Sequence, residues 1–130
     1  MAVKRKALVK THFDLEVYQT AYELTQKIFL LTRKFPKEEI YSLTSQIRRS
    51  SRSICGNIAE AWRKRRYEGA FISKLSDAEA EAAETQTWIH IAVGCEYLPR
   101  TTAADLYKAY DSVLGMVVSM INNAEQWKLK

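Results

Sequence analysis

Hydrophobic residues recur every three or four positions along most of the chain, which is the spacing of one face of an α-helix. Pro36 and Pro99 stop two of these periodic segments, because the residue before a proline disfavours helical geometry. The pattern predicts helices over residues 12–35, from 37 or 38 through at least 61, over 67–98, and from 102 to about 124. Long helices with short connections predict an all-α, antiparallel up-down four-helix bundle. We assign residues 13–127 to this bundle domain and residues 1–12 to a basic N-terminal arm.

Two expected helix starts have the spacing of a capping box, in which a hydroxyl and a carboxylate bind free backbone N–H groups. They are Thr11 with Asp14, and Thr102 with Asp105. We expect the first box to open the first long helix and the second box to open the last one.

The second helix carries polar residues among its expected core positions, which are Ile40, Leu43, Ile47, Ser50, Ile54, Asn57 and Ala61. A buried amide without partners costs roughly 1–3 kcal/mol, so Asn57 should be hydrogen-bonded. We expect a structural polar network that fixes the register of the helices, made of Ser53, Asn57, Glu60 and Glu84. A structural network is favoured over acid–base catalysis by these groups.

The first helix has two apolar stripes. One contains Val17, Ala21, Leu24, Ile28, Leu31 and Phe35, and the other contains Leu15, Tyr18, Tyr22 and Phe29. Together they make a face wider than one bundle core requires. This width indicates that the first helix also contacts another subunit.

The positive charge of the chain is concentrated in one segment. The whole protein has a formal net charge of +5, and residues 48–66 alone hold seven basic residues against one acid, Glu60. Arginine has a planar fork that can hold phosphate bidentately, so this basic stretch predicts a nucleic-acid-binding site. The candidate residues are Arg48, Arg49, Arg52, Arg63, Lys64, Arg65 and Arg66, with Lys4, Arg5 and Lys6 of the N-terminal arm.

Two aromatic residues, Trp62 and Tyr67, bracket the last four basic residues and are able either to stack on unpaired bases or to pack within the protein. The pattern contains no element for reading base edges, so binding should depend on charge and shape rather than on sequence.

A second interpretation is a protein-interaction scaffold. Residues 68–105 hold seven acids against two basic residues. The basic stretch could therefore pair with an acidic partner or with the acidic segment of a neighbouring subunit. The two interpretations differ in whether the arginines remain in solvent once the oligomer has formed.

Enzyme functions find no support in the motifs. A di-iron bundle needs Glu-x-x-His pairs, but Val9 and Thr87 stand three residues before His12 and His90. The two cysteines lack metal-ligand spacing, and no glycine-rich phosphate loop is present. We expect no catalytic site, no metal and no cofactor.

The sequence also bears on the cellular compartment. No apolar run approaches the ~20 residues of a membrane span, and no apolar segment of a secretory signal follows the first basic residues. Cys55 and Cys95 are expected to be free thiols. We therefore expect a cytoplasmic protein without membrane contact.

A set of positions across residues 13–123 matches a known pattern. They are Phe35-Pro36, Glu39-x-Tyr41-x-Leu43, Gln46-Ile47-Arg48-Arg49-Ser50, Ser53-Ile54-x-x-Asn57-Ile58-Ala59-Glu60, Phe71-x-x-x-Leu75, Ala78, Glu84-Thr85-Gln86-x-Trp88-Ile89 and Tyr97-Leu98. This pattern resembles the four helix bundle protein family, first noted as products of intervening sequences within bacterial 23S rRNA genes. The resemblance implies a four-helix protomer, often assembled as a ring-like homopentamer.

One departure from that pattern is informative. The family commonly has Gly after Ala-Glu, whereas this chain has Ala61-Trp62, followed by four basic residues and Tyr67. This variant is similar to accessory proteins of diversity-generating retroelements, which are basic homopentameric barrels. That resemblance implies nucleic acid and a reverse transcriptase as partners.

Overall fold

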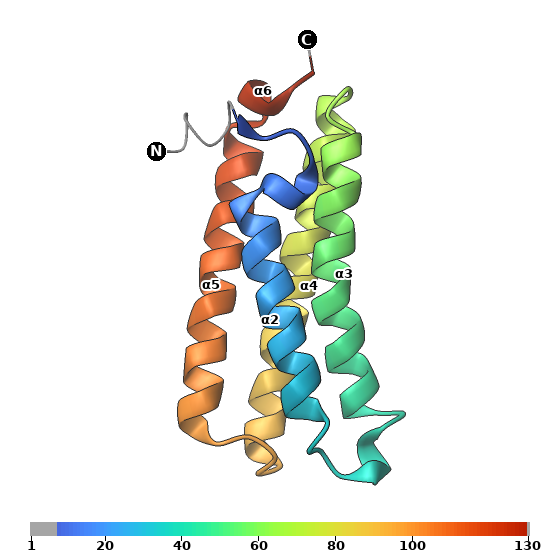
Figure 1. Ribbon diagram of the computed structural model, residues 1–130, viewed down its shortest axis with the longest axis vertical. Coiled ribbons are helices and arrows are strands. Elements are labelled where there is room, and N and C mark those ends of the chain that lie inside the picture. Colours follow the sequence, from blue (N-terminus) through green and yellow to red (C-terminus); the bar gives the residue numbers. More distant parts are fainter. Residues whose placement is uncertain (1–7, 130) are drawn as a thin grey trace.

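The computed structural model describes residues 8–129. Its elements are η1 (His12–Asp14), α2 (Glu16–Thr32), η2 (Lys37–Glu39), α3 (Leu43–Arg63), α4 (Glu68–Gly94), α5 (Arg100–Asn122) and α6 (Ala124–Trp127). The four long helices lie along one axis and alternate in direction from α2 to α5, as Figure 1 shows. Each packs on its neighbours in sequence, and α5 closes the bundle against α2. The predicted antiparallel up-down four-helix bundle is confirmed.

The helix starts differ from those expected. The carboxylate of Asp14 accepts the backbone N–H of Thr11 at 3.1 Å, but this box opens the short η1 and not α2. The box at Thr102 was a wrong prediction, because α5 already begins at Arg100, directly after Pro99. Proline fixes φ near the helical value and lacks the N–H that a first turn leaves unpaired, so it opens a helix without a side-chain cap.

The second long helix, α3, also begins later than predicted. Residues 37–39 form the separate turn η2, and the Glu39 carboxylate accepts the backbone N–H of Leu43, the first residue of α3, at 3.3 Å. Ile40 lies in the connecting turn and is 51% exposed, so its assignment to the core was wrong.

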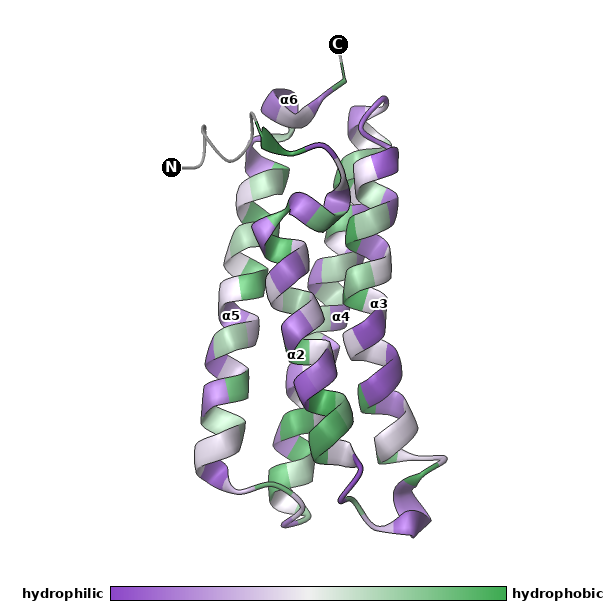
Figure 2. Cartoon of the chain, in the orientation of Figure 1, coloured by the Kyte–Doolittle hydropathy of each residue, from purple (hydrophilic) through white to green (hydrophobic). Residues whose placement is uncertain are grey.

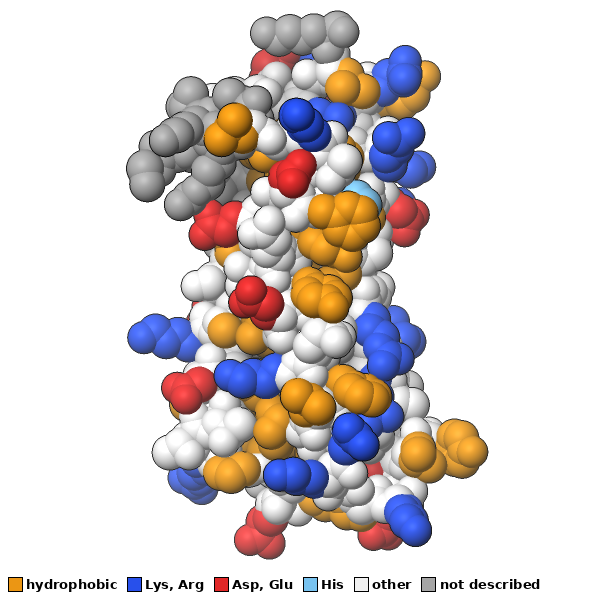
Figure 3. All heavy atoms as spheres, in the orientation of Figure 1, with side chains coloured by type: hydrophobic (Ala, Val, Ile, Leu, Met, Phe, Trp, Pro, Cys, Tyr) orange, Lys and Arg blue, Asp and Glu red, His pale blue; other side chains and the backbone are white. Residues whose placement is uncertain are grey.

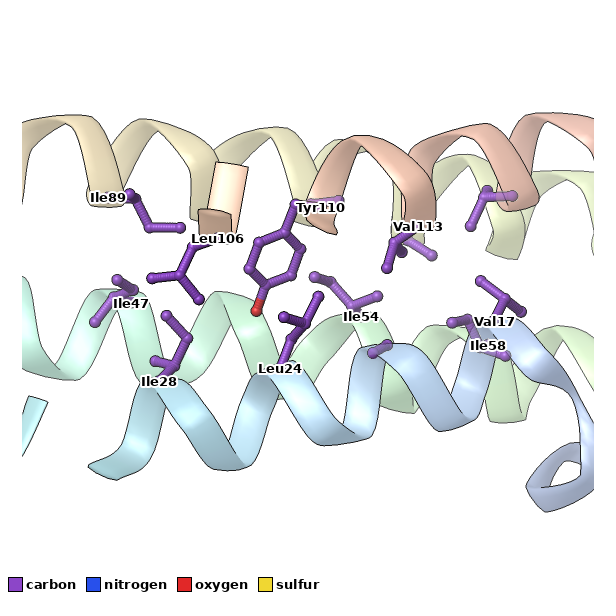
Figure 4. Packing of buried hydrophobic residues seen from close by; sticks show 14 of the residues in the cluster. Val17, Leu24, Ile28, Ile47, Ile54, Ile58, Ile89, Leu106, Tyr110 and Val113 are labelled. Carbon is purple, nitrogen blue, oxygen red and sulfur yellow. The ribbon is translucent and has the colours of Figure 1, made fainter. Parts of the chain in front are cut away.

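The core runs the length of the bundle along the inward faces of all four long helices. Figure 4 shows part of it, and Figure 2 shows how hydrophobic and hydrophilic residues alternate around each helix. Members that are at most 1% exposed include Ile28, Ile47, Ile54, Ile58, Leu75, Ile89, Leu106, Val113 and Val117. Ile58 rather than Asn57 follows Ile54 in the core, because a step of four residues keeps a helix of 3.6 residues per turn in register.

Buried hydroxyl groups join the helices at the middle of the bundle. The Ser50 and Thr85 hydroxyls hydrogen-bond at 2.8 Å between α3 and α4. The Thr25 hydroxyl donates to the carbonyl of Ala21 and lies 3.1 Å from that of Ser51, which links α2 to α3. These bonds satisfy polar atoms in an otherwise apolar core and fix the relative heights of the helices.

No helix among the described residues is long and apolar enough to cross a membrane.

Tyr110 is fully buried on α5, and its hydroxyl has no hydrogen-bond partner among the described residues. Figure 4 shows the ring crossing the core with its oxygen directed toward α2 and α3. Burial raises the pKa of this phenol. Because an unpaired buried polar group is costly, we expect Tyr110→Phe to raise the free energy of unfolding by about 1 kcal/mol. Urea unfolding of both proteins measures this change.

Tyr97 provides the matched control. Its hydroxyl donates to the Glu39 carboxylate at 2.7 Å, and this bond is the main reason that its pKa is raised to about 12. Tyr97→Phe should therefore lower the melting temperature. The raised pKa means that the contribution of this bond is present below the ordinary pKa of about 10 and is lost as the pH rises toward 12. A loss of stability in Tyr110→Phe equal to that in Tyr97→Phe would contradict the assignment of Tyr110 as unpaired.

Candidate nucleic-acid interface

The basic stretch occupies α3 and the turn that follows it, and the structure divides its side chains into three groups. Arg48 and Arg52 lie on the side of α3 next to α2, Arg49 lies on the side next to α4, and the other four lie at the end of the helix. Figure 3 shows basic side chains on the face formed by α2 and α3, with hydrophobic side chains among them. The seven candidate residues therefore lie in three different environments.

The end of α3 forms the most open group, which we call the basic turn (residues 63–67). Arg63, Lys64 and Arg66 are exposed, and Tyr67 is 67% exposed. The backbone N–H of Lys64 bonds to Glu60 and Ala61 and ends the helix, and the N–H of Tyr67 bonds to the carbonyl of Lys64 at 3.0 Å. Within residues 8–129, no carboxylate forms an ion pair with the basic side chains of this turn. The turn therefore presents three cations and an aromatic ring to solvent.

Trp62 and Arg65 support this turn from inside. Trp62 is only 5% exposed; it packs edge-on against Trp127 of α6, with ring centroids 6.1 Å apart. The Arg65 guanidinium lies 3.4 Å from the centroid of the Trp62 ring, and its Nε donates to the Trp62 carbonyl at 2.8 Å. Burial, with a smaller effect of Arg63, lowers the pKa of Arg65. Of the two aromatic candidates for base stacking, only Tyr67 is accessible.

Arg49 is engaged within the protein. Its guanidinium pairs with Glu81 at 3.3 Å and also with Glu84, both on α4. Hydrogen bonds to these two carboxylates raise the pKa of Arg49. Because its charge is already neutralised, Arg49 is the weakest candidate for a phosphate contact.

The third group surrounds the ring of Phe29 on α2. Arg48 and Arg52 reach this ring from α3, and Arg33 reaches it from the end of α2. Arg33 was not among the residues that we selected from the sequence. Its place four residues after Phe29, on the same helical face, is the signal that would have found it.

The predicted polar network is only partly assembled. Asn57 donates to the carbonyl and the hydroxyl of Ser53, at 2.9 and 3.2 Å, and Ser53 donates to Glu81 at 3.1 Å. Glu81, which joins Ser53 to Arg49, was not among the network residues predicted from the sequence. Glu84 accepts from Arg49 and from the indole N–H of Trp88. Glu60 was a wrong assignment, since its exposed side chain pairs with Lys74 at the surface, 3.2 Å away.

This arrangement predicts which acid matters for stability. We expect Glu81→Ala to lower the free energy of unfolding by about 1–2 kcal/mol, because Arg49 and Ser53 both lose a partner. Glu60→Ala removes only an exposed ion pair and should change stability by less than about 0.5 kcal/mol. Thermal unfolding of the two variants compares them directly, and equal losses would show that Glu81 does not hold a network.

The remaining candidates lie elsewhere. Lys4, Arg5 and Lys6 fall outside the described residues. Both cysteines are free, and burial raises the pKa of Cys55, which does not favour a reactive thiolate. In the part of the chain that the structure describes, no three His, Cys, Asp or Glu side chains are grouped in a way that could hold a metal ion.

An aromatic patch on the outside of the bundle adjoins this face. It consists of Phe13, Tyr18 and Tyr22, with the Phe13 and Tyr18 rings 5.4 Å apart and the Tyr18 and Tyr22 rings stacked at 6.4 Å. These three residues, with Gln19 and Glu23, line an open depression of about 460 Å³. Phe13 is 60% exposed and Tyr22 is 49% exposed, whereas Leu15 is buried, so the second apolar stripe of the first helix is left only partly uncovered in the protomer.

Comparison with known proteins assigns the chain to a family. The model of the family described as 23S rRNA-intervening sequence protein matches residues 13–119, most of the chain. The chain belongs to this family. A search of curated proteins found no match.

A solved structure supports the family assignment. The chain is similar to a protein of unknown function from the S23 ribosomal protein family of Bacteroides thetaiotaomicron VPI-5482, with 27% sequence identity and a TM-score of 0.73. The similarity covers 82% of this chain and 95% of that chain. The two chains thus share a fold, and neither comparison indicates a catalytic activity.

Proposed function

We propose that this protein is a non-catalytic, oligomeric accessory protein that binds RNA or DNA through phosphate contacts. The observation that carries this proposal is the basic turn. Arg63, Lys64 and Arg66 are exposed beside the accessible ring of Tyr67, and no acid of the described residues pairs with them. Three unneutralised cations and a ring able to stack on a base are the components that a sequence-independent nucleic-acid site uses.

The chemistry of the turn determines what binding should look like. Lysine and arginine contacts to phosphate release condensed counterions, so affinity should fall steeply with salt. Contacts to phosphates carry no sequence information, so unrelated sequences should bind alike. Tyr67 would add a preference for unpaired bases, because only these expose a face for stacking.

The family suggests which nucleic acid and which assembly to test first. Its description names an intervening sequence of 23S rRNA, so we propose RNA as the first ligand. The basic segment after Trp62 resembles that of retroelement accessory proteins, and on this basis we propose a homopentamer and a reverse transcriptase as a protein partner.

Fluorescence anisotropy of labelled oligonucleotides tests the central claim. Single-stranded RNA and DNA of several unrelated sequences should bind with similar affinities, and the logarithm of the affinity should fall linearly with the logarithm of the salt concentration. Absence of binding at low salt would overturn the proposal. Strong preference for one sequence with a shallow salt dependence would overturn the phosphate-contact mechanism.

A second candidate function is a scaffold in which the basic turn binds acidic protein surface. The observation that favours it is the exposed acids Glu68 and Asp77 on α4, which could face the cations of a neighbouring subunit. A sizing column decides between the two, since neutralising the basic turn would dissociate a scaffold but would leave an oligomer with a free nucleic-acid surface intact.

A further inference from the structure

Three guanidinium groups converge on one aromatic ring at the seam between α2 and α3. The Cζ atoms of Arg33, Arg48 and Arg52 lie 5.8, 4.9 and 6.0 Å from the centroid of the Phe29 ring. All three distances are within the range in which a cation is attracted to a ring. We call these residues the arginine cluster.

The sequence builds this cluster by helical spacing on two adjacent helices. Arg33 follows Phe29 by four residues at the end of α2, and Arg52 follows Arg48 by four residues on α3. Residues four apart lie one above the other on the same helical face. Because α2 and α3 pack side by side, the two pairs meet across the seam.

Arg48 is held in place by a buried hydroxyl. Thr32 is 3% exposed, and its hydroxyl donates to the carbonyl of Ile28 at 2.7 Å. The proton of the hydroxyl is therefore committed, and its oxygen accepts the Nε–H of Arg48 at 2.8 Å. This bond uses the one donor of the guanidinium that faces the protein and leaves its two terminal NH₂ groups free.

The charge of the cluster is not balanced by the protein. No carboxylate within residues 8–129 forms an ion pair with any of its three arginines. Arginine stays protonated in proteins, so about three positive charges share this site. Burial lowers the pKa of Arg48, and the neighbouring charges of Arg52 and Arg33 lower it further. An anion placed between these groups would relieve their mutual repulsion.

We propose that the arginine cluster on Phe29 is a binding site for a single phosphate group. A phosphate at the end of a strand, like inorganic phosphate, offers three or four free oxygens to the three planar forks, whereas a carboxylate or a backbone phosphodiester offers only two. The number of donors therefore fits a terminal phosphate of a nucleic acid best, and a backbone phosphate is the alternative that the test below separates. The nucleic-acid ligand rests on the function proposed above, but the phosphate site itself does not.

The cluster and the basic turn form two anchor points on one side of α3. Arg52 and Arg63 are eleven residues apart, which is three helical turns plus about 20°, so they project in nearly the same direction. At 1.5 Å per residue, the two points are about 16 Å apart along the helix. This distance corresponds to about five nucleotide steps of a stacked strand at 3.4 Å each.

Inorganic phosphate tests the site without any nucleic acid. Phosphate should raise the melting temperature of the wild-type protein more than chloride at equal ionic strength, because a ligand that binds only the folded state stabilises it. The variant Arg33→Gln/Arg48→Gln/Arg52→Gln should lose this difference. The matched control Lys37→Gln/Arg100→Gln/Lys108→Gln removes three exposed cations that are not among those contacting Phe29, and it should keep this difference. If phosphate shifts the melting temperature equally in the two variants, the proposed site is wrong.

A charge-conserving variant keeps the test valid if the triple variant fails to fold. Arg33→Lys/Arg52→Lys retains the charge and leaves the bond from Arg48 to Thr32, but it removes two of the three forks. We expect phosphate binding at least several-fold weaker than in the wild type. Unchanged binding would show that the site is only a region of positive charge and would overturn the proposal.

Oligonucleotides distinguish the source of the phosphate and the two proposals from each other. If a 5′-phosphorylated strand binds about tenfold tighter than the unphosphorylated strand, and the glutamine variant loses this difference, the cluster binds a terminal phosphate. If the glutamine variant loses affinity equally for both strands, the cluster binds a backbone phosphate. Binding of inorganic phosphate without binding of any strand would refute the nucleic-acid function and leave the site standing. Dissociation of the oligomer by the glutamine variant would show that the arginines hold another subunit, which would overturn the site.

Discussion

Replacing Arg63, Lys64 and Arg66 together by glutamine is expected to weaken the binding of RNA and DNA of any sequence by about tenfold to a hundredfold near 0.1 M salt. Each contact between these exposed side chains and a phosphate contributes about 0.7 to the salt slope for a single strand. Loss of three contacts should therefore flatten the slope by about two. Anisotropy at a series of salt concentrations measures both the affinity and the slope.

Arg65 is left unchanged in this variant because it supports the fold. Its guanidinium covers Trp62 and bonds to its backbone carbonyl, so its replacement would confuse lost binding with lost structure. The melting temperature of the triple variant should change little, since exposed charges contribute within about half a kcal/mol each. The control Lys37→Gln/Arg100→Gln/Lys108→Gln carries the same net charge and should bind more tightly than the basic-turn variant. Equal affinities would assign binding to overall charge and not to the turn.

The helices could be predicted from sequence because their signals are local and repeated. The spacing of Ile47, Ile54 and Ile58 identifies the inward face of α3, and Pro36 and Pro99 separate the elements on either side. The starts of the helices were harder to predict from the sequence. Whether Glu39 caps α3 depends on the path of a turn that no periodic pattern describes.

The candidate site was predicted in composition but not in arrangement. The basic stretch correctly identified the helix that carries the positive charge. Whether each side chain is neutralised or stays charged, however, depends on which residues of a neighbouring helix contact it. Arg49 meets Glu81 of α4 and is neutralised, whereas Arg48 meets Phe29 of α2 and remains charged. These contacts join residues separated by 19 to 32 positions, and charge counting along one segment does not include them.

Contacts with other helices also decide which polar residues of α3 belong to the predicted network. Ser53 and Asn57 are four residues apart on α3, so their bond follows from helical spacing. Glu60 shares the charge and the neighbourhood of a network residue, but it lies on the side of α3 where Lys74 can reach it from α4 in solvent. Its exposure to solvent, not its chemistry, removes it from the network.

The largest change in a measured quantity is expected for the assembly itself. We expect a solution mass well above the 15.0 kDa of the chain and, from the family resemblance, about five times that value. The physical reason is the aromatic patch on the side of α2, where Tyr22 is 49% exposed next to Tyr18 and Phe13. Burying such rings against a second copy contributes roughly 25 cal/mol per Å² of apolar surface removed from water. Light scattering at micromolar concentration measures the mass.

A charge introduced in this patch should reverse the assembly. Tyr22→Glu would place a carboxylate in a dry interface, where an unpaired charge costs several kcal/mol, and should therefore yield mainly monomers. Tyr107→Glu is the matched control, because Tyr107 lies on α5 outside the patch and is similarly exposed at 47%. It should leave the mass unchanged. If the wild-type protein is a monomer, the uncovered rings of α2 have no partner copy. If Tyr107→Glu alone dissociates the oligomer, the interface lies on α5.

Dissociation by Tyr22→Glu should also weaken nucleic-acid binding, although this substitution alters no phosphate contact. The reason is lost multivalency, because several copies in a closed ring would present several basic turns to one strand.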